Sequence, residues 1–235
     1  MPTPLSNNAV LTLRAKRLAR STRPFLARGN RVIRCQRCLL PEKNCLCHLI
    51  RTAQSRHRFC LVMFDTEPLK PSNTGRLIAD VLPNTLAFSW SRTDPDPALL
   101  ATVADPHYQA VIVFPESYAE PHRTIINHPP TVDKPLLFII LDGTWNEACK
   151  MFRKSPWLNQ YPLISLDIST TSQYRLREAS QPQQHCTVEV AIALLAAAGE
   201  VQAADILEKH FIQFRQRYLA GKSSHRVSIT GQDPD

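Results

Sequence analysis

Glycine is scarce in this chain, with 6 copies among 235 residues, whereas proline occurs 19 times. No Gly-x-Gly-x-x-Gly loop is present, which excludes the phosphate-binding turn of a dinucleotide-binding fold. Long apolar runs are also missing: the longest covers residues 190–198, too few to cross a bilayer. Because apolar residues still make up 43% of the chain, we expect a globular protein with no membrane association.

Acidic residues are absent from the first 41 positions, which nevertheless hold nine arginines and lysines. The remainder of the chain carries slightly fewer basic than acidic residues, so the net charge of +8 arises at the N-terminal end. Such a concentration favours contact with a phosphate backbone, and a solvated basic arm is the simpler alternative. The same end lacks the apolar segment of a secretion signal, so we expect a cytoplasmic location.

Short apolar runs alternate with amphipathic segments from residue 58 onward. The runs predict strands that are buried on both faces, and the segments predict helices; together they indicate a largely parallel α/β sheet with helices on both faces. The predicted strands are 58–64, 85–90, 110–114, 136–141 and 163–166. The predicted helices are 73–82, 97–104, 144–152, 187–198 and 201–218, preceded by a basic helix at 8–20.

Unusual residue clusters follow the ends of the predicted strands. In open parallel sheets, ligands bind beyond the carboxyl ends of the strands. Here those ends read Phe64-Asp65, Phe114-Pro115, Leu141-Asp142 and Leu166-Asp167. We therefore expect the functional site along this edge of the sheet.

Four of the seven cysteines form two short pairs near the basic segment. They are Cys35, Cys38, Cys45 and Cys47. Paired thiolates at this spacing predict a tetrahedral zinc site, whereas disulfides are disfavoured in the cytoplasm; His48 is an alternative fourth ligand. Four protein ligands leave no open position, so the zinc is expected to be structural and to hold a small RNA-contacting module. The remaining cysteines are expected to be buried: Cys60, Cys149 and Cys186.

Asp142 follows the most apolar strand and opens the sequence Asp-Gly-Thr-Trp. A carboxylate at this point either caps the next helix or faces a cleft. Capping alone does not require Trp145 in the first helical turn, whereas an aromatic ring beside a carboxylate is suited to stacking on a base or an adenine.

The segment Asp142-Gly143-Thr144-Trp145 resembles the Asp-x-Thr-Trp signature of the DTW-domain proteins. Three further segments are similar to motifs of that family: Asn73-Thr74-Gly75-Arg76-Leu77, Tyr174-Arg175-Leu176-Arg177 and Thr187-Val188-Glu189. The cysteine group fits the bacterial branch of the family, whose members modify a uridine in the variable loop of tRNA. The resemblance runs from residue 10 to residue 221, and no motif position departs from the family pattern.

The resemblance implies a SPOUT-like fold in which the C-terminal part of the sheet forms a trefoil knot that holds S-adenosylmethionine. It also implies an aminocarboxypropyltransferase, which moves the 3-amino-3-carboxypropyl group of this co-substrate to N3 of a tRNA uridine and releases methylthioadenosine. We divide the chain into a basic helix with a zinc-binding module at 1–57 and a catalytic domain at 58–235. The expected partner is tRNA, and no obligate protein partner is evident.

Asp142 is the candidate base that removes the N3 proton, and an electrostatic role facing the sulfonium is the alternative. Thr144 and Trp145 are predicted to complete the catalytic group. Residues at strand ends and helix starts are predicted to bind the co-substrate: Asn73, Thr74, Gly75, Phe114, Pro115, Leu141, Gly143, Tyr174, Arg175, Arg177, Cys186 and Thr187.

Simpler interpretations exist for several of these residues. Arg175 and Arg177 either clamp a carboxylate or phosphate, or form a solvated pair. Asn73 is also suited to capping a helix, and Thr187 is expected to cap the apolar helix as well as to touch the co-substrate. Three basic side chains follow Asp142 on the next predicted helix, and they either contact tRNA phosphates or form a solvated helix face. They are Lys150, Arg153 and Lys154.

Three other functions remain open at this point. A SPOUT-type RNA methyltransferase would use the same co-substrate in a different pose and release S-adenosylhomocysteine. The same group transfer to ribosomal RNA is the second. The third is a zinc-knuckle RNA-binding protein without catalysis, which explains the cysteines and the basic end but not the clusters that follow the strands.

Overall fold

The fold is built on one six-stranded sheet in which every pairing is parallel. The computed structural model describes residues 8–22, 32–130, 133–166 and 185–221. In spatial order the strands are β2 (Leu86–Ser89), β1 (Arg58–Met63), β5 (Leu136–Asp142), β3 (Gln109–Val113), β6 (Leu163–Ile164) and β4 (Ile125–Ile126). The predicted parallel α/β sheet is thereby confirmed, with β5 buried along its whole length at the centre.

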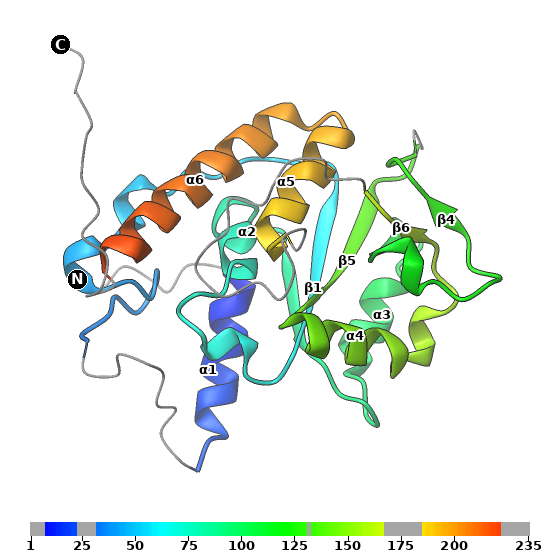
Figure 1. Cartoon of the computed structure of the whole chain (residues 1–235), viewed down its shortest axis with the longest axis horizontal. Helices are drawn as coiled ribbons and strands as arrows, with labels where there is room; N and C mark the ends of the chain where they lie inside the picture. Colours follow the sequence, from blue (N-terminus) through cyan, green and yellow to red (C-terminus); the bar gives the residue numbers. More distant parts are fainter. Residues whose placement is uncertain (1–7, 23–31, 131–132, 167–184, 222–235) are drawn as a thin grey trace.

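Helices cover both faces of this sheet, and alternate residues of the strands face each layer (Figure 1). In β5, Phe138 and Ile140 pack on one side while Ile139 and Leu141 pack on the other. The first layer contains α2 (Gly75–Val81), α5 (Thr187–Ala197) and α6 (Val201–Ala220). The second layer contains α3 (Pro97–Val103) and α4 (Trp145–Arg153).

The predicted basic helix is present as α1 (Ala9–Ala19), and it packs against the first layer. Asn8 caps it by accepting hydrogen bonds from the backbone N–H groups of Val10 and Leu11, at 3.0 and 3.1 Å. The amide of the same Asn8 side chain donates to Asp80 of α2 at 2.8 Å. One side chain therefore both starts α1 and fixes it to α2.

Two arginines of the basic end are used for this packing. Arg14 donates to the carbonyl oxygen of Leu69 at 2.7 Å, and Arg17 makes a two-point contact with Asp65 at 2.7 and 2.8 Å. Leu69 belongs to a short 3₁₀ turn, η3 (Glu67–Leu69), that follows β1. The charge of these two arginines is thus directed to the loop after β1, which reduces the number of basic residues on α1 that are available to a nucleic acid.

A buried polar group beneath α1 joins α2 to α6 and is bonded to α1 through Asn8. Arg76 is 1% exposed and lies 3.0 Å from Asp80, its partner one turn along α2. His210 of α6 lies 3.4 Å from the same carboxylate, and the Arg76 guanidinium lies over the ring of Phe214 at 5.4 Å. Because removing one member of such a group leaves buried charge without compensation, these residues tie α1, α2 and α6 to one arrangement.

Some element boundaries differ from the sequence-based expectation. The last strand was predicted over 163–166 but is limited to Leu163–Ile164, and β4 was not predicted because two isoleucines form no recognisable periodic pattern. The predicted knot depends on the path between β6 and α5, of which residues 167–184 lie outside the described part. The division into two units at residue 57 stays a prediction. Side chains from both sides of this boundary share one core cluster, in which Leu40 and Leu46 lie together with Phe59 and Phe138.

Stability should depend on the protonation of His57. Its Nδ1 accepts a hydrogen bond from the Leu136 N–H at 3.0 Å, and burial lowers the pKa of His57 below its usual value of 6.5. As the pH falls below about 6.5, the unfolded chain binds a proton at this position and the folded chain does not, so the free energy of unfolding falls.

We expect His57→Asn, whose side-chain oxygen keeps an acceptor near Leu136, to show a weaker loss of stability on acidification. Urea unfolding between about pH 5 and pH 7 measures this dependence. Equal pH dependence in the variant and the unmodified protein would show that His57 is not responsible.

Candidate functional site

Asp142 forms the centre of a polar site at the carboxyl edge of the sheet. It is the last residue of β5 and is 3% exposed. Its Oδ1 accepts a hydrogen bond from the Thr187 hydroxyl at 2.6 Å, and its Oδ2 accepts one from the Asn73 amide at 2.8 Å. Residues from three elements that are far apart in the sequence therefore meet at one carboxylate.

Gly75 makes this close approach of α2 and β5 sterically feasible. A Cβ atom at position 75 would lie 2.5 Å from Asp142 Oδ2 and 3.3 Å from a methyl group of Leu61. No ordinary side chain fits at that distance, so the space beside the carboxylate exists only because residue 75 is glycine. Binding of a co-substrate by Gly75 stays a prediction, and what the glycine makes room for here is Asp142.

Asn73 carries out two tasks at once. Its Oδ1 accepts from the Arg76 N–H at 2.9 Å and so caps α2, as expected of a helix start. Its Nδ2 donates both to Asp142 and, at 3.1 Å, to Glu67 Oε1. A single amide group therefore connects two buried carboxylates.

Glu67 is the member of this site that sequence reasoning missed. It is 1% exposed in η3, and its carboxylate also accepts a hydrogen bond from Lys70. Acidic residues in loops are usually solvated, and no local pattern distinguishes this one. The sequence feature that could have identified Glu67 is its position in the loop directly after β1, at the same sheet edge as Asp142.

Thr144 caps α4, and this excludes Asp142 as the cap. The Thr144 hydroxyl accepts from the Glu147 N–H at 3.4 Å, and the Glu147 carboxylate accepts from the Thr144 N–H at 2.7 Å. Asp142 is instead directed toward α2 and α5. A catalytic role for Thr144 stays a prediction, since its hydroxyl is exposed and engaged in this capping box.

Trp145 belongs to an aromatic cluster on the other face of the sheet edge. Its ring stacks on Phe114 with centroids 5.5 Å apart and an interplanar angle of 6°, and Tyr118 meets it edge-on. Phe114 is buried and also stacks on Phe152, whereas Pro115 is exposed. Among the predicted adenine-contacting residues, Trp145 and Pro115 are therefore the more accessible, and Phe114 supports the tryptophan from behind.

The start of α5 differs from the expectation in one respect. Thr187 was predicted to cap this helix, but the cap is Cys186, whose N–H donates to the Glu189 carboxylate at 2.8 Å. Thr187 is the first helical residue, and its hydroxyl is free to point at Asp142. Burial raises the pKa of Cys186, so its thiol stays neutral. Tyr174, Arg175 and Arg177 lie outside the described residues.

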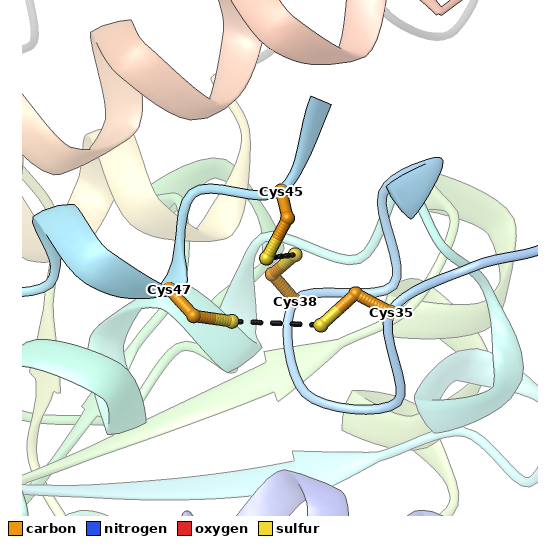
Figure 2. Close-up of side chains that lie close together, drawn as sticks. All are labelled: Cys35, Cys38, Cys45 and Cys47. Atoms are coloured by element: carbon orange, nitrogen blue, oxygen red, sulfur yellow. Dashed lines mark hydrogen bonds between the residues drawn. The ribbon is translucent and has the colours of Figure 1, made fainter. Parts of the chain in front are cut away.

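The four predicted cysteine ligands come together at a second location. Their sulfur atoms all lie within 4.8 Å of one another, and His48 is not part of the group. Figure 2 shows the thiols pointing toward a common centre, with Cys35 and Cys47 sulfurs 3.6 Å apart and Cys38 and Cys45 sulfurs 3.7 Å apart. A tetrahedral zinc with Zn–S distances of about 2.3 Å separates its sulfurs by about 3.8 Å, so the arrangement fits such an ion.

The electrostatics of this group also favour a cation. The nearby Cys47 thiol lowers the pKa of Cys38 to about 4, and the same proximity, with burial, raises the pKa of Cys47. Burial raises the pKa of Cys45 as well. One thiolate therefore forms easily while further ionisation is opposed, and a divalent cation removes that opposition by neutralising the thiolates.

The cysteine segment is attached to the last turn of α6. Asn44 donates from its side chain to the Arg217 carbonyl at 3.1 Å, and Arg217 donates to the Cys45 carbonyl at 3.0 Å. Leu40 and Leu46 within the segment are completely buried. The cysteine group is thus anchored to the main body through both polar and apolar contacts.

The DTW domain family matches residues 32–219, a range that contains both the cysteine group and the Asp142 site. The chain belongs to the DTW family. The chain is also similar to the tRNA-uridine aminocarboxypropyltransferase 2 of Macaca fascicularis, 30% identical over 174 residues, and to that of Mus musculus, 28% identical over 169 residues. Each match covers 69% of this chain and 55% of the relative. No solved structure matches the chain.

The DTW chain thus spans about half the length of the curated relatives that it matches. Its Asp-x-Thr-Trp segment occupies the carboxyl end of the central strand, where Asp142 is buried and Trp145 begins the following helix. Among the described helices, none combines the length and the apolar character that spanning a bilayer requires.

The contact between Gly75 and Asp142 predicts an unusual effect of adding one methyl group. In most helix interiors Gly→Ala is stabilising by about 1 kcal/mol. Here we expect Gly75→Ala to destabilise the protein by about 1–3 kcal/mol, because the new Cβ overlaps a buried carboxylate oxygen.

Thermal unfolding of Gly75→Ala, Asp142→Ala and the double variant measures the coupling between the two positions. The methyl group should cost less once the carboxylate is absent. An additive double variant would contradict the steric explanation.

Proposed function

We propose that this protein transfers the 3-amino-3-carboxypropyl group of S-adenosylmethionine to N3 of a tRNA uridine in the variable loop. The observation that carries the proposal is the buried Asp142 carboxylate of the DTW motif, oriented by Asn73 and Thr187 at the ligand-binding edge of a parallel sheet. The name of the two curated relatives supports the same reaction. We propose a cytoplasmic location for it.

The reaction needs a base because N3 of uridine carries a proton. In our mechanism Asp142 accepts that proton while the bond between N3 and the aminocarboxypropyl carbon forms. The carbon–sulfur bond of the sulfonium breaks, and its electron pair remains on the sulfur of methylthioadenosine. Thr187 and Asn73 hold the carboxylate in place, which reduces the reorganisation required in the transition state.

S-adenosylmethionine would lie along the edge lined by the DTW residues. The ring of Trp145 is suited to the adenine. Gly75 and Gly143 would act indirectly, because the space beside them is filled by Asp142 and by Glu147. Arg175 or Arg177 would bind the amino acid carboxylate, next to Tyr174, within a SPOUT-like knot. The remaining residues of this proposed site are Asn73, Thr74, Phe114, Pro115, Leu141, Cys186 and Thr187.

The cysteine group would hold one structural zinc. Four thiols that lie within 4.8 Å of one another can supply all the ligands of a tetrahedral zinc and leave no open coordination position, so a catalytic role for the metal is not proposed. Residues 1–57 would then form a basic, metal-stabilised unit that contacts tRNA, with 58–235 as the catalytic domain. Arg14 and Arg17 are engaged internally, so this contact would depend on the other basic residues.

Mass spectrometry of tRNA incubated with the protein and S-adenosylmethionine tests the reaction. We expect a uridine that carries the aminocarboxypropyl group and release of methylthioadenosine. A methylated base with S-adenosylhomocysteine would favour the methyltransferase, transfer to ribosomal RNA alone would change the substrate, and tRNA binding without turnover would favour a non-catalytic protein.

Asp142→Asn should reduce turnover by about 10²- to 10⁴-fold, because the amide cannot accept the N3 proton. Single-turnover kinetics with saturating tRNA measure this effect, and the tRNA affinity should be retained. If Asp142 acts as the base, the residual rate of the variant should rise with pH as hydroxide substitutes for it. A pH-independent residual rate would instead support the electrostatic role.

Metal analysis should find about one zinc per chain, and Cys38→Ser should lower that content. Because the cysteine segment is docked on α6, we expect metal removal by a chelator to lower the melting temperature. Cys149→Ser, which alters a buried cysteine outside the group, is the matched control and should keep its zinc. Full metal content in Cys38→Ser would argue against the four-cysteine site.

A further inference from the structure

An aromatic surface with one lysine lies beside the Asp142 site on the α4 face of the sheet. Phe64 follows β1 and Trp90 follows β2, and both side chains are half-buried against the α4 layer. Their rings stack with centroids 5.9 Å apart and an interplanar angle of 20°. Lys150 of α4 places its ammonium group 5.8 Å from the centre of the Phe64 ring and 5.9 Å from that of Trp90.

This lysine is exposed and is held over two rings rather than by an acidic partner. No carboxylate among the described residues lies within ion-pairing distance of Lys150. Trp90 is itself fixed, because its indole N–H donates to the buried Ser155 hydroxyl at 2.8 Å. The surface therefore offers an oriented ring system and an uncompensated positive charge, which are the two features that proteins use to bind single-stranded nucleic acid.

The position of the surface relative to Asp142 limits what can bind there. β2, β1 and β5 are neighbours in the sheet, so Phe64 and Trp90 lie about 5 and 10 Å across the sheet from the end of β5. The Phe64 N–H donates to the Asp142 carbonyl at 2.9 Å, which places the surface directly next to the reacting edge. A molecule that reaches Asp142 and continues along this edge meets Phe64 first and Trp90 second.

An RNA substrate presents the matching chemistry. N3 lies on the Watson–Crick edge of uridine, so a uridine that reacts there must be unpaired, and its neighbours lose a stacking partner when it is turned out. We propose that Phe64, Trp90 and Lys150 form a nucleotide subsite in which a nucleotide flanking the modified uridine stacks on the aromatic pair and places its phosphate on Lys150. This inference rests on the proposed function, because it takes the substrate to be RNA.

Equilibrium binding of an unmodified tRNA transcript, measured at several salt concentrations, separates the two contacts. Lys150→Gln should reduce the slope of log affinity against log salt by about 0.7–0.9, the value for one phosphate contact. Phe64→Leu keeps an apolar side chain but removes a ring, so it should weaken binding about tenfold with an unchanged slope. Both changes should raise the KM for tRNA more than they lower kcat.

The matched control is Lys209→Gln, which removes an exposed lysine of α6 that pairs with Asp205. It should bind tRNA like the unmodified protein, and melting temperatures should show that all variants are folded. Lys150→Arg should restore the salt dependence. If Lys150→Gln and Phe64→Leu bind tRNA as the control does, the subsite is wrong. If Phe64→Leu instead weakens S-adenosylmethionine binding, the surface serves the co-substrate and the proposal is overturned.

The binding measurement does not depend on turnover, so the two proposals can fail separately. Formation of the aminocarboxypropyl product together with unaltered tRNA binding by the variants would reject the subsite alone. Weakened binding by the variants, in a protein that forms no such product, would reject the proposed reaction while keeping the nucleotide contact.

Discussion

The burial of one carboxylate governs the arrangement of this site. Asp142 lies at the end of a completely buried central strand, where a charge without partners would be strongly destabilising. Its hydrogen bonds come from the starts of two helices, through Asn73 before α2 and Thr187 in α5. The starts of these helices and the glycine at residue 75 bring donors to that charge at short range, and Asn73 shares its amide group with the second carboxylate, Glu67.

The parallel sheet and most of its helices could be predicted from the sequence because buried strands and amphipathic helices have distinct periodicities. The cysteine group could also be predicted, because its four members are close along the chain and their spacing is typical of a metal site. Glu67 could not, because its burial depends on the loop after β1 packing against distant segments. The cap at Cys186 was missed because cysteine is not among the residue types that usually cap a helix. β4 was missed because it is short: two residues are too few to form a periodic pattern.

Part of the positive charge of the basic N-terminal segment makes contacts inside the protein. Nine basic residues within 41 positions indicate affinity for polyanions. However, Arg14 and Arg17 donate their hydrogen bonds to the loop that follows β1. That loop contains Glu67, so part of the basic segment stabilises the edge of the sheet at which Asp142 lies. Charge counted along a sequence is therefore an upper limit on the charge that a ligand meets.

The hydrogen bonds between the cysteine segment and the last turn of α6 join residues separated by 172 and 173 positions. A ribosome produces the cysteines well before this helix, so under the proposed function the thiols would meet zinc while the sheet is still being synthesised. The surface on which the loaded segment docks is completed only when α6 emerges. Binding of the proposed metal and docking on α6 would thus be separated in time, and a nascent chain that stalls before α6 would lack the polar contacts that Arg217 provides to the cysteine segment.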